Sequence, residues 1–584
     1  MRKIPVLLVA TFTLSCVSRA PETPAPETRP AHTVVIRGTR TIPPAWTLRS
    51  RPATAKHAMV VTAHPLATQA GVEILKQGGN AIDAAVAVAF ALEVVLPDAG
   101  NIGGGGFIVH RSAAGEVLAL DYREAAPAAA THDMYLDSAG NVTENSLVGH
   151  MASGVPGSVA GLYTAWKRLG SLPWPVLLAP AIRLANGHVV DSARSRDITN
   201  DRELLAQFPA SRAQFLPNDS APPPGKLWQQ PDLARTLQLL SDSGPDVFYR
   251  GQIADLIVAE MQRGGGGGLI TRNDLRAYRA KWRTPVELTY RGYTIYSMPP
   301  PSSGGVTMGE ILNILEGYDT IPALGTPAYE HLLAEAMRRA FMDRNHWLGD
   351  PDFVQMPIER LLSKSYGASL RSEIDLQHAT PTPPSVTTGG GVHTTHYSIV
   401  DAKGNAASVT TTLNGGFGSG VTVTGAGFLL NNEMDDFTSA PGKPNMYGLV
   451  QGEANAIAPG KRMLSAMTPS IVLDRNGKLL LVVGTPGGPT IITTVAQVIL
   501  NVLDQRMSLA DAVAAPRIHH QALPDVLHYE RDGLSEATVR ALEMMGHRME
   551  MRRGMSGIVA GIQHTAGGWI GVADPRYAGG ALGY

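Results

Sequence analysis

Thr394 stands where a break in the chain would turn it into a complete nucleophile-and-base pair. It lies between a Gly/Thr/Pro-rich tract and a strand-like run that opens with Thr394, Thr395 and His396. A cut between His393 and Thr394 would give Thr394 a free α-amine beside its own hydroxyl. A hydroxyl is a weak nucleophile without a base. An α-amine, with a pKa near about 7.7–8.0, can accept the hydroxyl proton close to neutral pH.

The residues after Thr394 predict a hairpin that brings a second threonine near it. Strand-like runs at 394–401 and 407–413 flank Ala-Lys-Gly-Asn, a turn signal at 402–405. A three-residue loop would place Thr412 opposite Thr394. A two-residue loop would shift the register by one residue, so both registers stay open here.

The rest of the chain alternates helical and strand-like patterns without an internal repeat. Helices are predicted over 66–76, 81–92, 159–169, 176–186, 232–241, 252–263, 329–344 and 491–503, and further strands over 102–110, 471–473 and 479–483. Thr271 and Asp274 form a capping-box pattern at the start of another helix. Length alone suggests about four domains, but the mixture without repeats favours one α/β core.

Composition narrows the class of protein. The chain has 584 residues, 44% of them hydrophobic and 17% charged, which is typical of a globular protein with a large core. Its formal net charge is -1, and lysines and arginines are scattered, so nothing indicates nucleic-acid binding. Cys16 is the only cysteine, which excludes an internal disulfide.

The N-terminus has the pattern of an export signal, predicted at 1–20. Arg2 and Lys3 precede an apolar run at 4–14, and a small-x-small site ends at residue 20. That run is too short to span a bilayer. Cys16 is compatible with a lipid-attachment box, although Thr13 stands where leucine is usual, so lipoprotein and simple secretion both stay open. Either predicts a periplasmic or secreted protein, with a Pro-rich tether at 21–54.

Several other patterns favour a structural interpretation. The glycine run at 103–106 lacks the Lys-Ser/Thr of a phosphate loop, which favours close packing. His519 and His520 match no zinc spacing, and no calcium loop surrounds Asp435 and Asp436. No Gly-x-Ser-x-Gly elbow occurs. The sequence therefore predicts no metal and no cofactor.

Long strings spread over the chain resemble the γ-glutamyltranspeptidase family, across about residues 55–584. The matching strings are 101–107, 121–124, 153–158, 297–305, 348–353, 394–398, 430–437 and 486–488. The resemblance implies a four-layer αββα N-terminal-nucleophile hydrolase that cuts itself between His393 and Thr394. It also implies a heterodimer of a large subunit, 55–393, and a small catalytic subunit, 394–584, which together build the sandwich.

The resemblance also implies roles for particular residues. Thr412 would hydrogen-bond the nucleophile, and the Gly487 and Gly488 amides would form an oxyanion hole. Residues implied in holding the donor are Arg123 for its α-carboxylate, Glu433 and Asp436 for its α-ammonium, Asn414, Ser465, and Tyr447 in a lid at 441–452. The family usually has two adjacent serines where this chain has Ser465 and Ala466, so one hydroxyl for the carboxylate is missing.

The function implied is a self-processing γ-glutamyltransferase and glutathione hydrolase. Thr394 would take the γ-glutamyl group from glutathione or another γ-glutamyl amide and pass it to water, an amino acid or a dipeptide. One alternative is a related acylase for a glutaryl-type β-lactam side chain, which Ala466 favours and Asp436 disfavours. The other is an uncleaved, non-catalytic envelope protein that uses the fold for binding.

Overall fold

Two antiparallel sheets of seven strands each form the centre of the part of the chain that is described after residue 46. The computed structural model describes residue 1 and residues 47–265, 267–382, 394–552 and 557–584. The predicted export signal, Cys16 and His393 lie outside the described residues.

One sheet, here called the Thr394 sheet, has Thr394 at the start of an inner strand. Its order is β19 (Gly580–Gly583), β2 (Met59–Thr62), β10 (Thr394–Val400), β11 (Ala406–Thr412), β3 (Gly105–Arg111), β4 (Val117–Asp121) and β7 (Lys281–Arg283). The adjacent inner strands β10 and β11 lie between β2 and β3, which both come from earlier in the chain.

The other sheet, the Gly484 sheet, also mixes early and late segments. Its order is β1 (Ala53–Ala55), β18 (Gly568–Ala573), β17 (Ala560–Thr565), β13 (Leu479–Gly484), β12 (Ser470–Leu473), β9 (Tyr293–Ser297) and β8 (Val286–Tyr290). Ala53 and Thr54 pair with β18, so they belong to this sheet and not to the tether predicted at 21–54.

Alternating side chains along the strands explain why the two sheets stack. In β2, Met59 and Val61 join the apolar cluster shared with the Gly484 sheet, whereas Val60 joins the cluster under the opposite helices. In β3, Val109 belongs to the cluster shared with the Gly484 sheet, and Ile108 belongs to the cluster under the opposite helices. Because successive strand residues point to opposite faces, each inner strand is buried on both sides and needs a layer on each.

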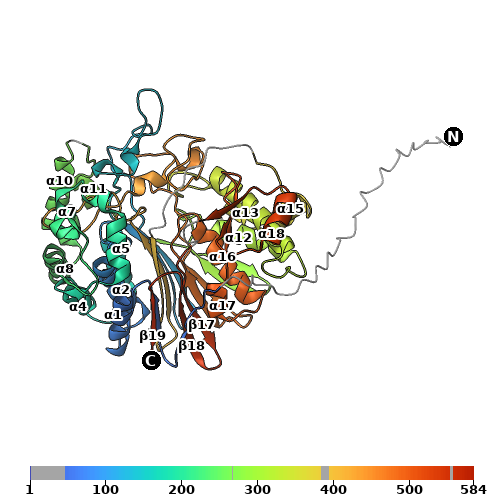
Figure 1. The fold of residues 1–584 in the computed structure, drawn as a ribbon, viewed down its shortest axis with the longest axis horizontal. Helices are drawn as coiled ribbons and strands as arrows, with labels where there is room; N and C mark the ends of the chain where they lie inside the picture. Colours follow the sequence, from blue (N-terminus) through green and yellow to red (C-terminus); the bar gives the residue numbers. More distant parts are fainter. Residues whose placement is uncertain (2–46, 266, 383–393, 553–556) are drawn as a thin grey trace. The chain divides into compact units, whose positions relative to one another are not determined.

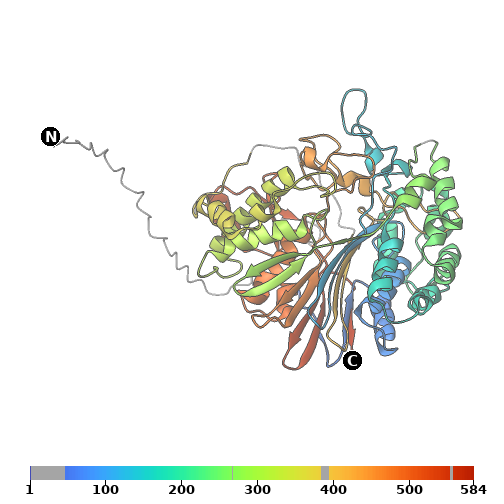
Figure 2. The same ribbon diagram turned by 180° about the vertical axis from the view of Figure 1, so that it is seen from behind.

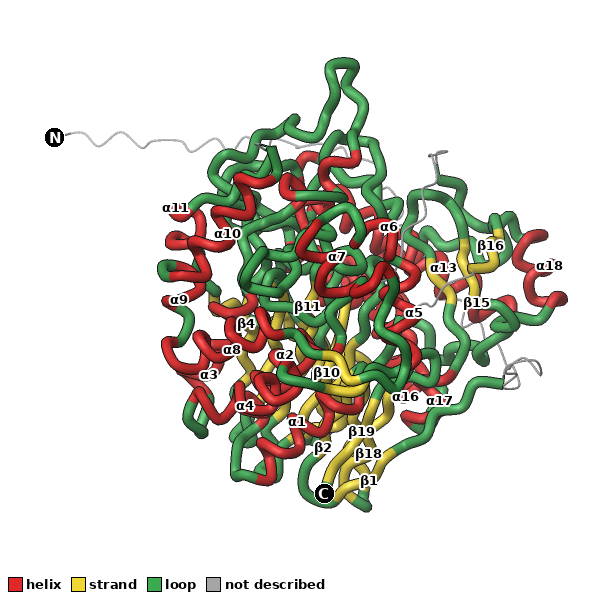
Figure 3. Tube along the Cα trace, turned by 60° about the vertical axis from the view of Figure 1, so that its left-hand side comes forward, coloured by secondary structure: helices red, strands yellow, loops and turns green. Residues whose placement is uncertain are grey.

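Helices cover the outer face of each sheet (Figure 1). Beside the Thr394 sheet lie α1 (Pro65–Lys76), α2 (Ala81–Val95), α3 (Ser158–Leu169), α4 (Trp174–Ala185), α8 (Pro231–Ser243) and α10 (Gln252–Arg263). Beside the Gly484 sheet lie α12 (Gly304–Glu316), α13 (Pro327–Trp347), α16 (Thr490–Leu503) and α17 (Leu509–Ala514). Figures 2 and 3 show the strands between the two groups of helices. The predicted αββα class is confirmed.

Shorter elements complete the described chain. They are β5 (His188–Val189), β6 (Leu227–Trp228), β14 (Ile518–His519), β15 (Leu527–Glu530), β16 (Met549–Arg552), α5 (Ser192–Asn200), α6 (Arg202–Leu205), α7 (Pro209–Phe215), α9 (Asp246–Tyr249), α11 (Arg272–Ala277), α14 (Ile358–Leu361), α15 (Lys364–Ser372), α18 (Glu536–Met544), and the 3-10 helices η1 (Glu144–Ser146), η2 (His150–Ala152), η3 (Pro217–Asp219), η4 (Glu433–Asp436) and η5 (Glu453–Asn455). None of the helices described is both long and apolar enough to cross a membrane.

Most predicted elements match these bounds, and the differences have local causes. The helix predicted at 252–263 has those bounds, and Thr271 and Asp274 form the predicted capping box at α11. The helix α12 was not predicted, because it opens on Gly304 and Gly305, which are poor helix formers. Both are needed there: a Cβ on Gly304 would lie 2.2 Å from the Thr468 hydroxyl oxygen.

The glycine run at 103–106 packs against backbone, as predicted. A Cβ on Gly103 would lie 2.0 Å from the carbonyl oxygen of Leu429, and one on Gly104 would lie 2.2 Å from the carbonyl oxygen of Thr412. These approaches hold the end of β11 against the segment that leads into β3.

We therefore expect Gly103→Ala to lower the melting temperature sharply or to prevent soluble expression, because the Leu429 carbonyl cannot move without disturbing its segment. Thermal unfolding of the purified variant measures the effect. Gly567→Ala is the matched control, since its Cβ would meet only Thr565 Oγ1 at 3.8 Å. Equal melting temperatures for the two variants would contradict the packing role.

Candidate active site

The hairpin β10–β11 places Thr394 and Thr412 side by side. The two threonines are paired across the strands, and their hydroxyl oxygens are 3.1 Å apart. Asp401 and Asn405 close the turn through a 3.0 Å backbone hydrogen bond, which leaves a three-residue loop. The three-residue alternative is therefore the observed register, and the one-residue slip does not occur.

The hydroxyl of Thr412 is held from a second side. The backbone N–H of Asn414 donates to Thr412 Oγ1 at 2.8 Å, and the side chain of Asn101 donates to the Thr412 carbonyl at 2.8 Å. Asn414 has a positive φ of 75°, which turns the chain sharply after β11. Because its oxygen already accepts one N–H, the Thr412 hydroxyl can direct its own proton toward Thr394.

One cavity brings most of the predicted residues together. Its lining consists of Arg123, Arg344, Thr394, Thr412, Asn414, Glu433, Asp436, Tyr447, Leu449, Ser465, Ala466, Met467, Gly488, Pro489 and Ile491. Of the residues predicted from the sequence and described here, Gly487 is next to this lining and all the others are in it. Arg344 was not predicted as a site residue. From the sequence, Arg344 is predicted only to be the last residue of a helix at 329–344.

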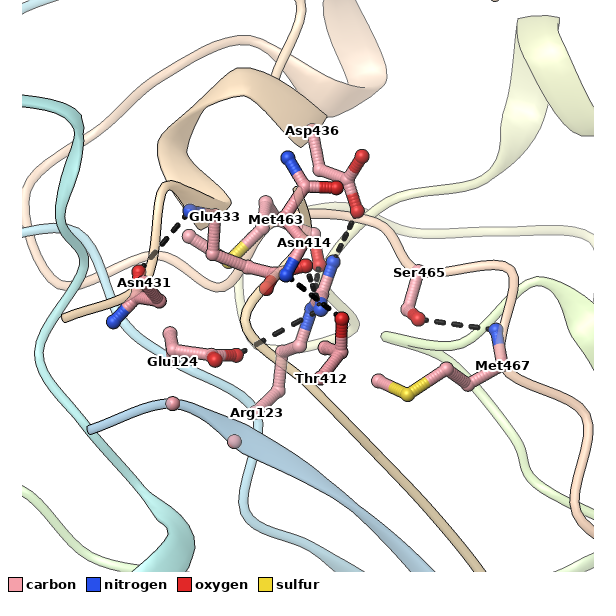
Figure 4. Close-up of polar contacts among 12 residues, drawn as sticks. Arg123, Glu124, Thr412, Asn414, Asn431, Glu433, Asp436, Met463, Ser465 and Met467 are labelled. Atoms are coloured by element: carbon pink, nitrogen blue, oxygen red, sulfur yellow. Dashed lines mark hydrogen bonds and ion pairs between the residues drawn. The ribbon is translucent and has the colours of Figure 1, made fainter. Parts of the chain in front are cut away.

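Arg123, which follows β4, is surrounded by carboxylates (Figure 4). Its Nη1 donates to Glu433 and its Nη2 to Asp436, while Glu124 Oε2 lies 3.7 Å from Nη1. Its Nε donates to the Met463 carbonyl at 3.3 Å. Burial opposes the charge of Arg123, but the three carboxylates outweigh burial and raise its pKa above the ordinary value.

Two of the carboxylates around Arg123, those of Glu124 and Glu433, are buried. Glu124 is fully buried, and neither of its carboxylate oxygens has a hydrogen-bond partner among the described residues. Burial raises the pKa of Glu124 to about 7, although Arg123 opposes the shift. Burial also raises the pKa of Glu433 well above its ordinary value. These carboxyl groups therefore take up protons far more readily than exposed ones do.

Gly487 and Gly488 form the turn between β13 and α16 at the other side of the cavity. Gly487 has φ 144° and Gly488 has φ 54°, and a Cβ on Gly488 would lie 2.8 Å from the ring of Tyr447. Within the described part of the chain, neither backbone N–H makes a hydrogen bond. Two free amides at the start of a 14-residue helix can stabilise a negative charge.

Tyr447 belongs to the segment predicted to be a lid, 441–452, and lines the cavity. Its hydroxyl donates to the Asn414 carbonyl at 2.8 Å, and its own carbonyl accepts from Gln521 at 3.1 Å. Elsewhere in the lining, Ser465 Oγ accepts the N–H of Met467 at 3.1 Å (Figure 4). Ala466, the departure noted in the sequence, is part of the cavity wall.

The other polar patterns have structural partners. His519 lies within hydrogen-bond distance of Thr493 and Gln521, and His520 lies 3.2 Å from Asp525. Asp435 Oδ1 accepts from the Ser146 hydroxyl at 2.8 Å. These contacts support the structural interpretation of the histidines and give Asp435 a partner of its own.

A sandwich of two sheets between helices, with a threonine opening an inner strand beside a cavity, is the architecture of the N-terminal-nucleophile hydrolase class. The family model described as Gamma-glutamyltranspeptidase matches residues 67–584. The chain belongs to the γ-glutamyltranspeptidase family.

Individual relatives agree over nearly the whole length. The chain is 46% identical over 533 residues to the glutathione hydrolase proenzyme of Escherichia coli (strain K12), covering 90% of this chain and 91% of that protein. It is 48% identical over 551 residues to the glutathione hydrolase proenzyme of Pseudomonas sp. (strain A14), covering 91% and 95%. A crystal structure of cephalosporin acylase from Bacillus halodurans superimposes with a TM-score of 0.82 at 29% identity, covering 92% of this chain and 98% of that one.

Asp435 gives a test of the electrostatics beside the cavity. Burial raises its pKa to about 7. An acid with a raised pKa in the folded state favours folding most at low pH, and this contribution is lost as pH rises from its unfolded pKa near about 4 through about 7.

We expect Asp435→Asn to gain stability relative to the unchanged protein as pH rises from about 4 to about 8, because the amide never ionises. Thermal unfolding of both proteins over this range provides the comparison. A difference in melting temperature that does not vary with pH would show that Asp435 does not titrate as inferred.

Proposed function

We infer that this protein is a self-processing γ-glutamyltransferase and glutathione hydrolase with Thr394 as its nucleophile. The observation that carries the proposal is one cavity that contains the Thr394 hydroxyl, paired with that of Thr412, and a set of opposite charges: the buried Arg123 and Glu433 and the half-buried Asp436. The family and the names of its relatives agree with this activity.

Cleavage between His393 and Thr394 would free the α-amine that the reaction needs. Thr394 Oγ then attacks the γ-carbonyl carbon of the donor while its proton passes to that amine. The tetrahedral intermediate collapses, the carbon–nitrogen bond breaks, and the departing amine takes the proton. A γ-glutamyl ester on Thr394 remains. Water, an amino acid or a dipeptide releases the acyl group in a second attack of the same kind.

Gly487 and Gly488 would stabilise the negative oxygen that develops in both steps. Their amides make no hydrogen bond within the described residues, so they are available to a ligand. Removing one such donor typically slows a reaction by about 10²–10³. The Thr412 hydroxyl, 3.1 Å from the Thr394 oxygen, would support the nucleophile as its proton leaves.

The charges at the other end of the cavity fit the head group of a γ-glutamyl donor. That head group carries an α-ammonium and an α-carboxylate. Glu433 and Asp436 would take the ammonium, and their release from Arg123 would free its planar fork for the carboxylate. Asn414 and Ser465 lie in the same lining and would supply neutral hydrogen bonds.

A second candidate is an acylase that acts on a side chain without an α-ammonium, such as a glutaryl group. Ala466 removes one hydroxyl from the wall that would face the α-carboxylate, and the named cephalosporin acylase has the same fold. Asp436 favours the γ-glutamyl donor, because a glutaryl group offers it no cation.

We also propose that the protein acts outside the cytoplasm, in the periplasm or after secretion. The support is the charged start, short apolar run and small-x-small site within residues 1–20. Attachment of a lipid at Cys16 is part of this proposal. Mass spectrometry of the mature N-terminus distinguishes a lipidated Cys16 from a simple cleavage after residue 20.

We predict that Thr394→Ala stays a single polypeptide and has no activity, because it loses the nucleophile for both cleavage and turnover. A denaturing gel and an anilide assay measure both effects. Thr395→Ala is the control, since the Thr395 hydroxyl is buried without a hydrogen-bond partner in the described part, and it should still give two fragments. If the unchanged protein were active while running as one band, self-processing would be overturned; if it ran as one band and were inactive, the non-catalytic alternative would be favoured.

We predict that Asp436→Ala still cleaves itself but loses γ-glutamyl turnover by about a hundredfold or more in kcat/KM, since a half-buried charge partner of the donor is removed. Parallel assays with γ-glutamyl and glutaryl anilides provide the measurement. Turnover of the glutaryl substrate should change much less. If the unchanged protein prefers the glutaryl anilide, the acylase proposal replaces the γ-glutamyl one.

A further inference from the structure

Arg344, near the end of α13, differs from the other large buried arginines of the described chain. It is 1% exposed, as buried as Arg123, Arg194 and Arg338. Each of those three has a carboxylate partner, respectively Glu433, Asp98 and Asp525. Arg344 forms no ion pair with any residue that the structure describes, yet it lines the cavity that contains Thr394.

The partners of Arg344 are all neutral. Its Nε donates to Ser303 Oγ at 3.0 Å, and its Nη1 donates to Asn345 Oδ1 and Gln451 Oε1, both at 2.9 Å. Its Nη2 donates to nothing in the described part of the chain. Burial lowers the pKa of Arg344 to about 10, partly offset by Asp436, so the side chain is still a cation at neutral pH.

An unpaired buried cation is costly, because a low-dielectric interior cannot replace the water that it gives up. A protein that keeps such a group beside a cavity gains from it only when an anion arrives. The neutral hydrogen bonds orient the guanidinium without neutralising it. The charge of Arg344 is therefore left for a ligand.

The neutral partners also fix where that charge lies. Ser303, which accepts from Arg344, donates to the Ser465 carbonyl at 2.7 Å. Gln451, which also accepts from Arg344, donates to the backbone carbonyl of Asp436 at 3.3 Å. Arg344 is thus tied to two walls of the cavity, one with Ser465 and one with Asp436.

Arg123 is in the opposite situation. Glu433 and Asp436 already occupy its two Nη groups, and Glu124 lies close by. An entering carboxylate must compete with these groups for Arg123, whereas Arg344 has no ion-pair partner in the described chain that a carboxylate would have to displace. The two arginines line the same cavity.

We propose that Arg344 is a second cation for the α-carboxylate of the donor, acting together with Arg123 and substituting for the hydroxyl that Ala466 lacks. The proposal rests on the γ-glutamyl function above and deepens it. It makes Arg344 a residue that determines specificity for donors with a carboxylate beside the ammonium. It assigns Arg344 no part in bond making.

The test compares two donors on Arg344→Gln, Arg344→Lys and the unchanged protein. One donor is γ-glutamyl anilide, and the other is 4-aminobutyryl anilide, which lacks only the α-carboxylate. We expect Arg344→Gln to raise KM for γ-glutamyl anilide at least about tenfold, with a much smaller change in kcat. Arg344→Lys should recover part of the loss. The 4-aminobutyryl donor should be turned over equally by all three.

Calorimetry with L-glutamate keeps the test decisive if the 4-aminobutyryl donor reacts too slowly to measure. Glutamate should bind Arg344→Gln at least about tenfold more weakly. Arg360→Gln is the control, because Arg360 is exposed on α14 and its loss changes the net charge equally. Two bands on a denaturing gel confirm that each variant folded and cleaved.

Two results would overturn the role of Arg344: an equal loss with both donors, or an unchanged affinity for glutamate. Failure of the γ-glutamyl proposal would look different, because the unchanged protein itself would then not use γ-glutamyl anilide. Glutamate binding to the unchanged protein and to Arg344→Gln would still decide whether the charge receives a carboxylate.

Discussion

The pairing of β10 with β11 is the constraint on which the rest of the site depends. Side chains alternate between the two faces of a strand, so a shift of one residue would turn the Thr394 hydroxyl to the wrong face. The observed register sets Thr394 opposite Thr412. Asn101 and Gly104 hold the end of β11 through its carbonyl. The nucleophile is therefore positioned by a buried inner strand that is paired on both sides.

A second constraint is the balance of buried charge. Arg123 lies among three carboxylates, whereas Arg344 has only neutral partners in the described chain. The same cavity is thus lined by one arginine with several carboxylate partners, Arg123, and by one without an ion-pair partner in the described chain, Arg344. A ligand that carries both an ammonium and a carboxylate can rearrange the first pair and satisfy the second. A ligand with only one of these charges leaves some of the buried charged side chains without a partner, and the free-energy cost of burying them is then not offset.

The interleaving of strands bears on what self-cleavage would do. Each sheet contains strands from before and after Thr394, so neither portion forms either complete sheet alone. A break ahead of β10 would release a chain end without separating the core. The proposed reaction needs such an arrangement, since the new amine must stay beside its own hydroxyl and the cavity must keep walls from both portions.

The sequence by itself determined the elements with strong periodicity, the hairpin after Thr394 and, through the family strings, every polar side chain of the cavity lining except Arg344. It could not choose between the two hairpin registers, because turn signals leave the loop length open; the packing of β10 and β11 between β2 and β3 decides it. It missed α12, whose opening glycines are explained only by their close contacts with Thr468 and Met298. It also gave no sign of Arg344, because a charged residue at the end of a helix usually faces water. Only the tertiary structure, by burying that end of α13 against the cavity without a carboxylate, shows that its charge is unpaired.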